Sequence, residues 1–161
     1  MTIKTFAQPT PRGNTNTRRA MTLIVGVGVL LLLITAFFAW QMSYLPAELD
    51  LSRTQMSQRG HFAVTYEPAG GTIPVGELQS WTLSVTTLQG RAIEGAHIEV
   101  DGDMPQHGHG LASQPQITQD LGEGRYLLEG LKFQMGGWWV IEATITDGNL
   151  TDTVRFNLQL E

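Results

Sequence analysis

The stretch that decides the fold is WWVIEATITDGNLTDTVRFNLQL, residues 138–160. Its first part is rich in tryptophan, isoleucine, valine and threonine, which favour β-strands. Apolar side chains then alternate with polar ones from Val154 to Leu160, as in a strand with one buried face. Asp147-Gly148-Asn149 between the two segments is typical of a hairpin turn. The stretch therefore predicts a pair of strands joined by a tight turn.

Similar strand patterns extend back from residue 138 to His61. Five further segments are bounded by turn residues such as glycine and proline: 62–66, 81–85, 93–100, 116–119 and 125–131. About seven strands in about 100 residues are typical of an immunoglobulin-like sandwich. No long amphipathic helix interrupts them, which argues against α/β folds. The predicted fold class is all-β: an immunoglobulin-like seven-stranded sandwich preceded by one N-terminal transmembrane helix.

The N-terminal part predicts a membrane anchor. Met21–Trp40 contains no charged residue, and a helix of this length spans about 30 Å, the thickness of the hydrocarbon core. Arg18 and Arg19 precede it, so the positive-inside rule places the N-terminus in the cytoplasm. The alternative is a cleaved signal peptide, whose apolar core is usually about 7–15 residues long and ends in small residues. Aromatic residues crowd the end of this longer core, which favours an uncleaved signal anchor.

The chain is therefore predicted to contain four segments. These are a cytoplasmic tail (1–20), a transmembrane helix (21–40), a linker (41–60) and an extracytoplasmic sandwich (61–161). The tail is polar and has the composition of a disordered segment. The linker is a mixed polar stretch with scattered leucines, so a short helix against the domain or the membrane is an open alternative to a plain linker.

Composition argues against several functions. The chain has no cysteine, which rules out a disulfide, a thiolate nucleophile and a zinc-thiolate site. Six basic and fifteen acidic residues follow the apolar run, and such an acidic domain suits a cation or a basic partner rather than nucleic acid. No nucleophile-elbow, phosphate-loop, metalloprotease or dinucleotide-binding fingerprint is present, so the protein is predicted not to be an enzyme.

The candidate functional site is the segment Asp103-Met104-Pro105-Gln106-His107-Gly108-His109-Gly110. His107 and His109 are two residues apart, so in an extended segment both rings project to one side. In an immunoglobulin-like sandwich the loop that contains Met135 lies at the same end. Imidazole binds several transition metals, and thioether sulfur selects Cu(I) among the common ions. The predicted metal ligands are Met104, His107, His109 and Met135, and the predicted metal is copper. The anchor is expected to enter from the opposite end, so that this end points away from the membrane.

The same residues also have a structural interpretation. Met104 and Met135 can close the open end of the core, because methionine fills irregular gaps. The two histidines can instead hydrogen-bond a carbonyl group or face solvent.

Four other features are predicted to be structural or exposed. His61 and His97 are expected at the surface, and Asp101-Gly102-Asp103 is predicted to form a tight turn. Tyr126 is expected to tie down a turn.

Three motifs resemble the YtkA-like and FixH-like families. They are residues 103–110, Gly124-Arg125-Tyr126, and Phe133-Gln134-Met135-Gly136-Gly137-Trp138-Trp139. The resemblance covers roughly residues 60–160. It implies a membrane-anchored extracytoplasmic β-sandwich, with the matching metal positions at Met104, His107, His109 and Met135. FixH-like proteins are associated with assembly of a copper-containing cytochrome oxidase. Unlike the full FixH arrangement, the tail here is short and has no clear cytoplasmic partner motif.

The predicted function is binding or delivery of copper, with a respiratory metalloprotein or its assembly factors as partner. The predicted location is the bacterial inner (cytoplasmic) membrane, with the C-terminal domain in the periplasm or outside the cell. The alternative is a non-catalytic interaction module that docks a membrane or periplasmic partner without metal. A third hypothesis is a small ligand in an apolar pocket at the open end of the sandwich.

Overall fold

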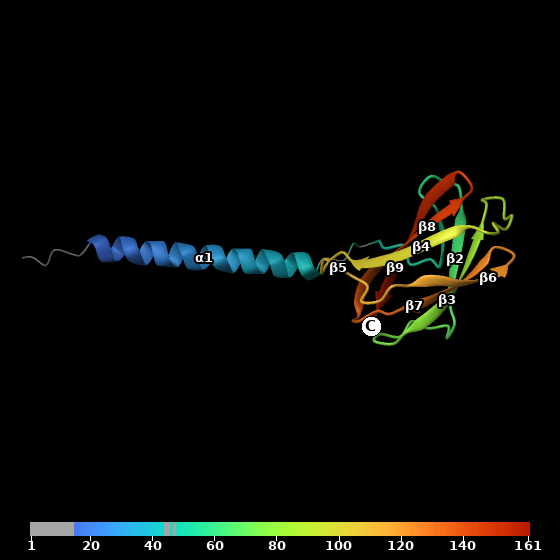
Figure 1. Ribbon diagram of the computed structural model, residues 1–161. Coiled ribbons are helices and arrows are strands. Elements are labelled where there is room, and N and C mark those ends of the chain that lie inside the picture. The colour runs from blue at the N-terminus through green and yellow to red at the C-terminus, as the bar shows by residue number, and fades with distance from the viewer. Residues whose placement is uncertain (1–14, 44–45, 47) are drawn as a thin grey trace, which may run out of the picture. The chain divides into compact units, whose positions relative to one another are not determined.

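The chain forms two compact units, Met1–Ser43 and Tyr44–Glu161, and the computed structural model describes residues 15–43, 46 and 48–161. In the first unit, α1 (Thr15–Ser43) is one helix of 29 residues (Figure 1). Its segment Arg19–Trp40 is long and apolar enough to cross a membrane, with a mean hydropathy of 2.7. A membrane anchor and a signal sequence both fit this helix. Residues 1–14 of the predicted tail lie outside the described residues.

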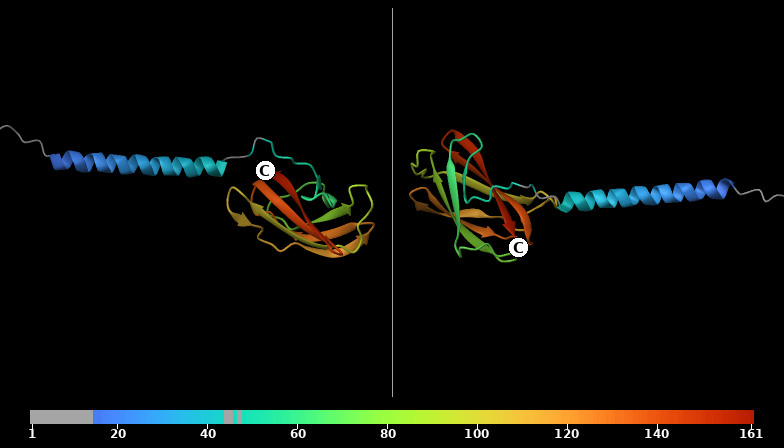
Figure 2. Two further views of the ribbon diagram at one scale, coloured as in Figure 1. Left: turned by 90° about the horizontal axis from the view of Figure 1, so that it is seen from above. Right: turned by 180° about the vertical axis from the view of Figure 1, so that it is seen from behind.

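The second unit is a sandwich of two antiparallel sheets, which Figure 2 shows from two further sides. The five-stranded sheet has the order β1 (Thr54–Met56), β2 (Ala63–Pro68), β3 (Gln79–Thr86), β7 (Arg125–Leu131) and β6 (Gln116–Gly122). The four-stranded sheet has the order β5 (His109–Gly110), β4 (His97–Met104), β8 (Gly137–Asp147) and β9 (Leu150–Leu160). Without the short strands β1 and β5, this is the four-plus-three arrangement of immunoglobulin constant-type domains. The predicted sandwich is confirmed.

Alternation of side chains along the strands builds one core between the sheets. Along β3 every second residue is buried, and β8 shows the same pattern over most of its length. Aromatic rings pack in this core: Tyr66 stacks on Trp81 of the same sheet at 4.4 Å between ring centres and meets Phe156 of the other sheet edge to face at 5.0 Å. Burying a large apolar side chain contributes about 1.5–3 kcal/mol, so this layer dominates the stability of the domain.

Tyr126 ties the sheets together near the start of β7. Its side chain is buried, and its hydroxyl donates to the Ile93 carbonyl at 2.7 Å. The same hydroxyl accepts from the Ala96 backbone N–H at 3.0 Å. Burial raises the pKa of Tyr126, so the hydroxyl keeps its proton and both bonds over the ordinary pH range. This confirms the prediction that Tyr126 ties down a turn.

The tight turn predicted at Asp101-Gly102-Asp103 is wrong. These residues continue β4, where Asp103 is the register partner of Val140 in β8. The glycine serves packing rather than a turn, because a Cβ on Gly102 would lie 2.5 Å from Ile141 Cδ1. Packing of β4 against β8 therefore overrides the turn-forming composition of the three residues.

The second half of the predicted linker belongs to the sandwich. β1 pairs with β2, and the backbone N–H of Arg59 donates to both carboxylate oxygens of Asp152 in β9, at 3.0 and 3.2 Å. Before β1, the Asp50 carbonyl accepts from Asn157 Nδ2 at 3.2 Å. Asn157 pairs with Val140, which pairs with Asp103, so this stretch lies toward the end of the sandwich that holds Met104. The expectation that the chain enters the sandwich from the opposite end is wrong. β1 precedes β2 and runs antiparallel to it, so the chain enters β1 from the end that holds Met104.

Candidate functional site

The segment predicted as the site forms a hairpin rather than an open loop. β4 ends at Met104, residues 105–108 turn, and β5 returns so that His109 is the register partner of Met104. The backbone N–H groups of His107 and Gly108 both donate to the Met104 carbonyl, at 3.0 and 2.9 Å. Gly108 has a φ of +67°, which favours glycine. His107 therefore sits in a turn and not in an extended segment, contrary to the sequence-based expectation.

The turn nevertheless brings the two histidine rings together. The ring centres of His107 and His109 are 5.8 Å apart, and the ring planes differ by 29°. Both residues are exposed, at the tip of the hairpin. The two rings therefore lie near each other through a tight turn, and not through the extended segment that was predicted.

Gln134 connects the neighbouring loop to this hairpin. Its Oε1 accepts from the Ala112 backbone N–H at 3.3 Å, and its Nε2 donates to the Gly110 carbonyl at 3.0 Å. These two bonds fix the orientation of the amide, so the Nε2 group also faces His109 Nδ1, at 3.3 Å, as a donor. His109 Nδ1 then accepts, and in the neutral ring the proton lies on Nε2. Sequence reasoning missed this role of Gln134, and the only available signal was its position in a loop predicted for the same end of the sandwich.

Met104 lies inside the core. Its side chain is fully buried, and its Cε would be only 2.8 Å from a Cβ on Gly137, which has a φ of +122°. Met104 therefore plugs this end of the sandwich, together with the buried rings of Phe133 and Trp139. This placement matches the structural interpretation of Met104.

Met135 lies at the same end, and more than a third of it is exposed (39%). Its carbonyl accepts from Trp139 Nε1 at 3.0 Å, and the Trp139 ring lies 6.1 Å from the His109 ring. The loop between β7 and β8 thus meets the histidine hairpin, as the strand order predicted. Within the described part of the chain, no group of three or more His, Cys, Asp or Glu side chains is arranged to hold a metal ion. A metal here would therefore rest on the two imidazoles.

The two other histidines lie elsewhere. His97 is exposed, as predicted, and its Nε2 is 3.3 Å from Glu99 Oε1. His61 is only partly exposed, and its Nδ1 lies 3.5 Å from Asp152 Oδ2. Both rings contact residues away from the tip of the hairpin, so among the described histidines only His107 and His109 belong to the site.

Comparison with known proteins places the domain in a family. The YtkA-like family model matches residues 53–144, more than half of the chain. A solved DUF4426 family protein from Pseudomonas aeruginosa is similar at 16% identity and a TM-score of 0.47, covering 66% of this chain and 94% of that one. No curated protein matches the sequence significantly. The closer resemblance to FixH-like proteins stays a prediction. By the match over residues 53–144, the chain belongs to the YtkA-like family.

Proposed function

We propose that this protein binds one copper ion at His107 and His109 outside the cytoplasm and passes it to a partner. The observation that carries the proposal is the pairing of the two exposed rings, with centres 5.8 Å apart. An ion about 2.0–2.1 Å from a ring nitrogen lies about 3.2 Å from that ring's centre. Two rings on one ion then have centres about 5.2 Å apart for tetrahedral and about 6.4 Å apart for linear binding. The observed separation falls within this range.

The chemistry of the surrounding residues favours Cu(I). The chain has no cysteine, and the exposed thioether at this end belongs to Met135. Imidazole with thioether is a donor set that suits Cu(I) better than zinc or magnesium. Met104 serves packing in this proposal, because its side chain has no exposed surface. A site at the tip of a hairpin leaves the ion open to a partner, as transfer requires.

The remaining parts of the proposal concern location and partner. Helix α1 anchors the protein in the bacterial inner membrane with the N-terminus in the cytoplasm and the sandwich in the periplasm or outside the cell. The partner is a respiratory metalloprotein or one of its assembly factors, as in the FixH-like resemblance. The protein itself is non-catalytic. Support comes from the apolar segment Arg19–Trp40, the two arginines at its start and the YtkA-like family.

The test of the metal site is a Cu(I) titration against a competing chelator. We expect one copper per chain for the wild type and an affinity lower by about tenfold or more for His107→Ala/His109→Ala. The matched control is His97→Ala, which removes an exposed histidine outside the site and should leave copper affinity unchanged. Equal binding by wild type and double variant would refute the site. It would also favour the metal-independent interaction module.

The location has a separate test, which uses the absence of native cysteine. A single cysteine at the exposed position Glu67 of β2 should react with a membrane-impermeant maleimide in cells whose outer membrane is permeabilised. A cysteine that reacts only after lysis of the inner membrane would contradict the export of the domain. The mass of the mature chain then distinguishes an uncleaved anchor from a cleaved signal peptide.

A further inference from the structure

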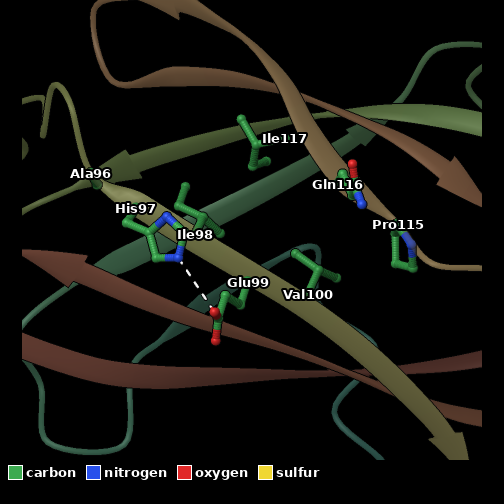
Figure 3. A pocket seen from close by; sticks show the side chains of 8 residues that line it. All are labelled: Ala96, His97, Ile98, Glu99, Val100, Pro115, Gln116 and Ile117. Carbon is green, nitrogen blue, oxygen red and sulfur yellow. Dashed lines mark hydrogen bonds and ion pairs between the residues drawn. The ribbon is translucent and has the colours of Figure 1, made fainter.

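A groove lies on the flank of the sandwich, away from the histidine hairpin. It has a volume of about 470 Å³ and opens between β4 of one sheet and β6 of the other. This volume is in the range of about 300–1,000 Å³ found for binding clefts. Figure 3 shows its lining: Ala96, His97, Ile98, Glu99, Val100, Pro115, Gln116 and Ile117. Apolar Ile98, Val100 and Ile117 thus share one groove with the charged side chain of Glu99.

The β4 side of the groove is a free sheet edge. β4 pairs with β8 from His97 to Asp103, whereas β5 covers its other edge only at Asp103 and Met104. The Gly102 carbonyl accepts from the Leu111 N–H at 3.0 Å and therefore points away from β8. Backbone groups alternate in direction along an antiparallel strand, so those of Ile98 and Val100 point the same way. In the described structure no strand pairs with this stretch, which leaves two N–H and two C=O groups facing the groove.

Apart from its acidic side chains, this edge lacks the usual protections against strand addition. The pairing of β4 with β8 runs from His97 to Asp103 without a bulge, whereas β6 across the groove has two register shifts against β7. Bulges, prolines and lysines are common means of blocking an edge, and β4 contains none of them. The stretch from residue 97 to 102 is therefore a regular edge that an extended segment can join.

Charge decides which segment fits. β4 carries three acidic side chains, at Glu99, Asp101 and Asp103, and β6 carries Asp120. Neither strand contains lysine or arginine. A second copy of this chain joined through β4 would place its acidic residues against those of the first, and facing like charges destabilise a strand pair. The edge therefore favours a segment with basic residues.

We propose that the groove between β4 and β6 binds an extended, basic segment of a partner protein, which adds to β4 as a further strand. The segment's backbone hydrogen-bonds to the unpaired N–H and C=O groups of Ile98 and Val100. Its apolar side chains pack against the apolar side of the groove, which Ile98, Val100 and Ile117 form. Its lysine or arginine side chains project on the other face, toward Glu99 and Asp101. This interaction is independent of the metal site.

The test uses a fluorescent heptapeptide that alternates lysine and valine, and the full chain in phosphatidylcholine nanodiscs. A matched peptide that alternates glutamate and valine is the ligand control. Fluorescence anisotropy should show saturable binding of the basic peptide that weakens as salt rises, because the contacts are partly ionic. Hydrogen exchange of the backbone amides of Ile98 and Val100 should slow about tenfold or more when the peptide is bound.

Two variants separate the edge from general charge. Glu99→Lys/Asp101→Lys reverses two exposed charges and should weaken binding about tenfold or more, whereas Glu67→Lys on the other sheet should leave it unchanged. Val100→Pro removes one edge N–H without breaking a bond to β8, and it should also weaken binding. Circular dichroism of each variant checks that the sandwich is folded.

Several results would overturn the proposal. These are absence of binding at about millimolar peptide, equal binding of the acidic peptide, and equal loss in Glu67→Lys. Binding without protection of the Ile98 and Val100 amides would place the peptide elsewhere. Protection of these amides that grows with protein concentration in the absence of peptide would assign the groove to a second copy of the chain.

Discussion

Replacing Asp152 by alanine should strongly destabilise the sandwich. The carboxylate is 2% exposed and accepts backbone N–H groups from Arg59 at 3.0 Å and from Thr153 at 2.9 Å. It also bonds to the Ser57 hydroxyl, and the His61 N–H lies 3.4 Å away. These bonds hold the turn between β1 and β2 on β9. Alanine leaves the donors unpaired in a poorly solvated place.

The size of the effect follows from the bonds that are lost. Hydrogen bonds to a charged group contribute about 1.5–3 kcal/mol each, but neighbouring bonds to one group are not additive. A loss of about 2–4 kcal/mol is expected for the variant as a whole. For a domain of this size about 1 kcal/mol shifts the Tm by about 4 °C, so the Tm should fall by about 8–16 °C.

The stability that Asp152 contributes should also depend on pH. Burial by itself raises the pKa of Asp152, but the hydrogen bonds from Ser57 and the three backbone N–H groups together hold it below its usual range. A carboxylate with a lowered folded-state pKa stabilises the fold fully above its unfolded pKa of about 3.9. That contribution disappears as pH falls through the folded-state pKa. The stability gap between wild type and Asp152→Asn should therefore be constant from about pH 5 to 7 and shrink below about pH 4.

Thermal and urea unfolding of the fragment 44–161, followed by circular dichroism, measures both effects. Glu67→Ala is the control, because this acid is exposed on β2. The reasoning is refuted by an Asp152→Ala Tm within about 2 °C of the wild type, or by a stability gap that is the same at pH 3 and pH 7.

Three further predictions concern packing and the site. Tyr126→Phe should lower the unfolding free energy by about 1–3 kcal/mol in urea titrations, because the Ile93 carbonyl and the Ala96 N–H lose their hydrogen-bond partner. An unchanged urea midpoint would contradict this prediction. Gly102→Ala should cost about 1–3 kcal/mol by the same measurement, since its Cβ would overlap Ile141, and Gly70→Ala, with open space around its Cβ and no positive φ, is the packing control. Gln134→Glu should raise copper affinity about tenfold in the chelator competition, because a carboxylate can accept a hydrogen bond from His109 Nδ1–H and so leave the Nε2 lone pair for the metal; weaker binding would show that the metal uses Nδ1.

The sequence predicted most of the fold because its signals are periodic. Alternation over residues 154–160 and the turn at Asp147-Gly148-Asn149 mark β9 and its hairpin with β8. The two short strands were missed, since two or three residues cannot display a period of two. The turn predicted at residues 101–103 failed because the composition of three residues does not reveal a neighbour such as Ile141.

The site was predicted in part for similar reasons. Strand order correctly placed the loop of Met135 at the end of the sandwich that holds the histidines. The burial of Met104 was available from the sequence, because Ile98, Val100, Gly102 and Met104 share one face of a continuous strand. The assumed turn interrupted that alternation. The role of Gln134 depends on contacts between two loops distant in sequence, which no local pattern contains.

X-ray absorption of the Cu(I)-loaded protein tests the central proposal most directly, because it reports the atoms bound to the metal. We predict two nitrogen neighbours at about 2.0 Å, with sulfur at about 2.3 Å that is lost in Met135→Leu and retained in Met104→Leu. His107→Ala/His109→Ala should lose the nitrogen signal. A spectrum that is unchanged in this double variant, or sulfur that is lost in Met104→Leu alone, would contradict the site proposed here.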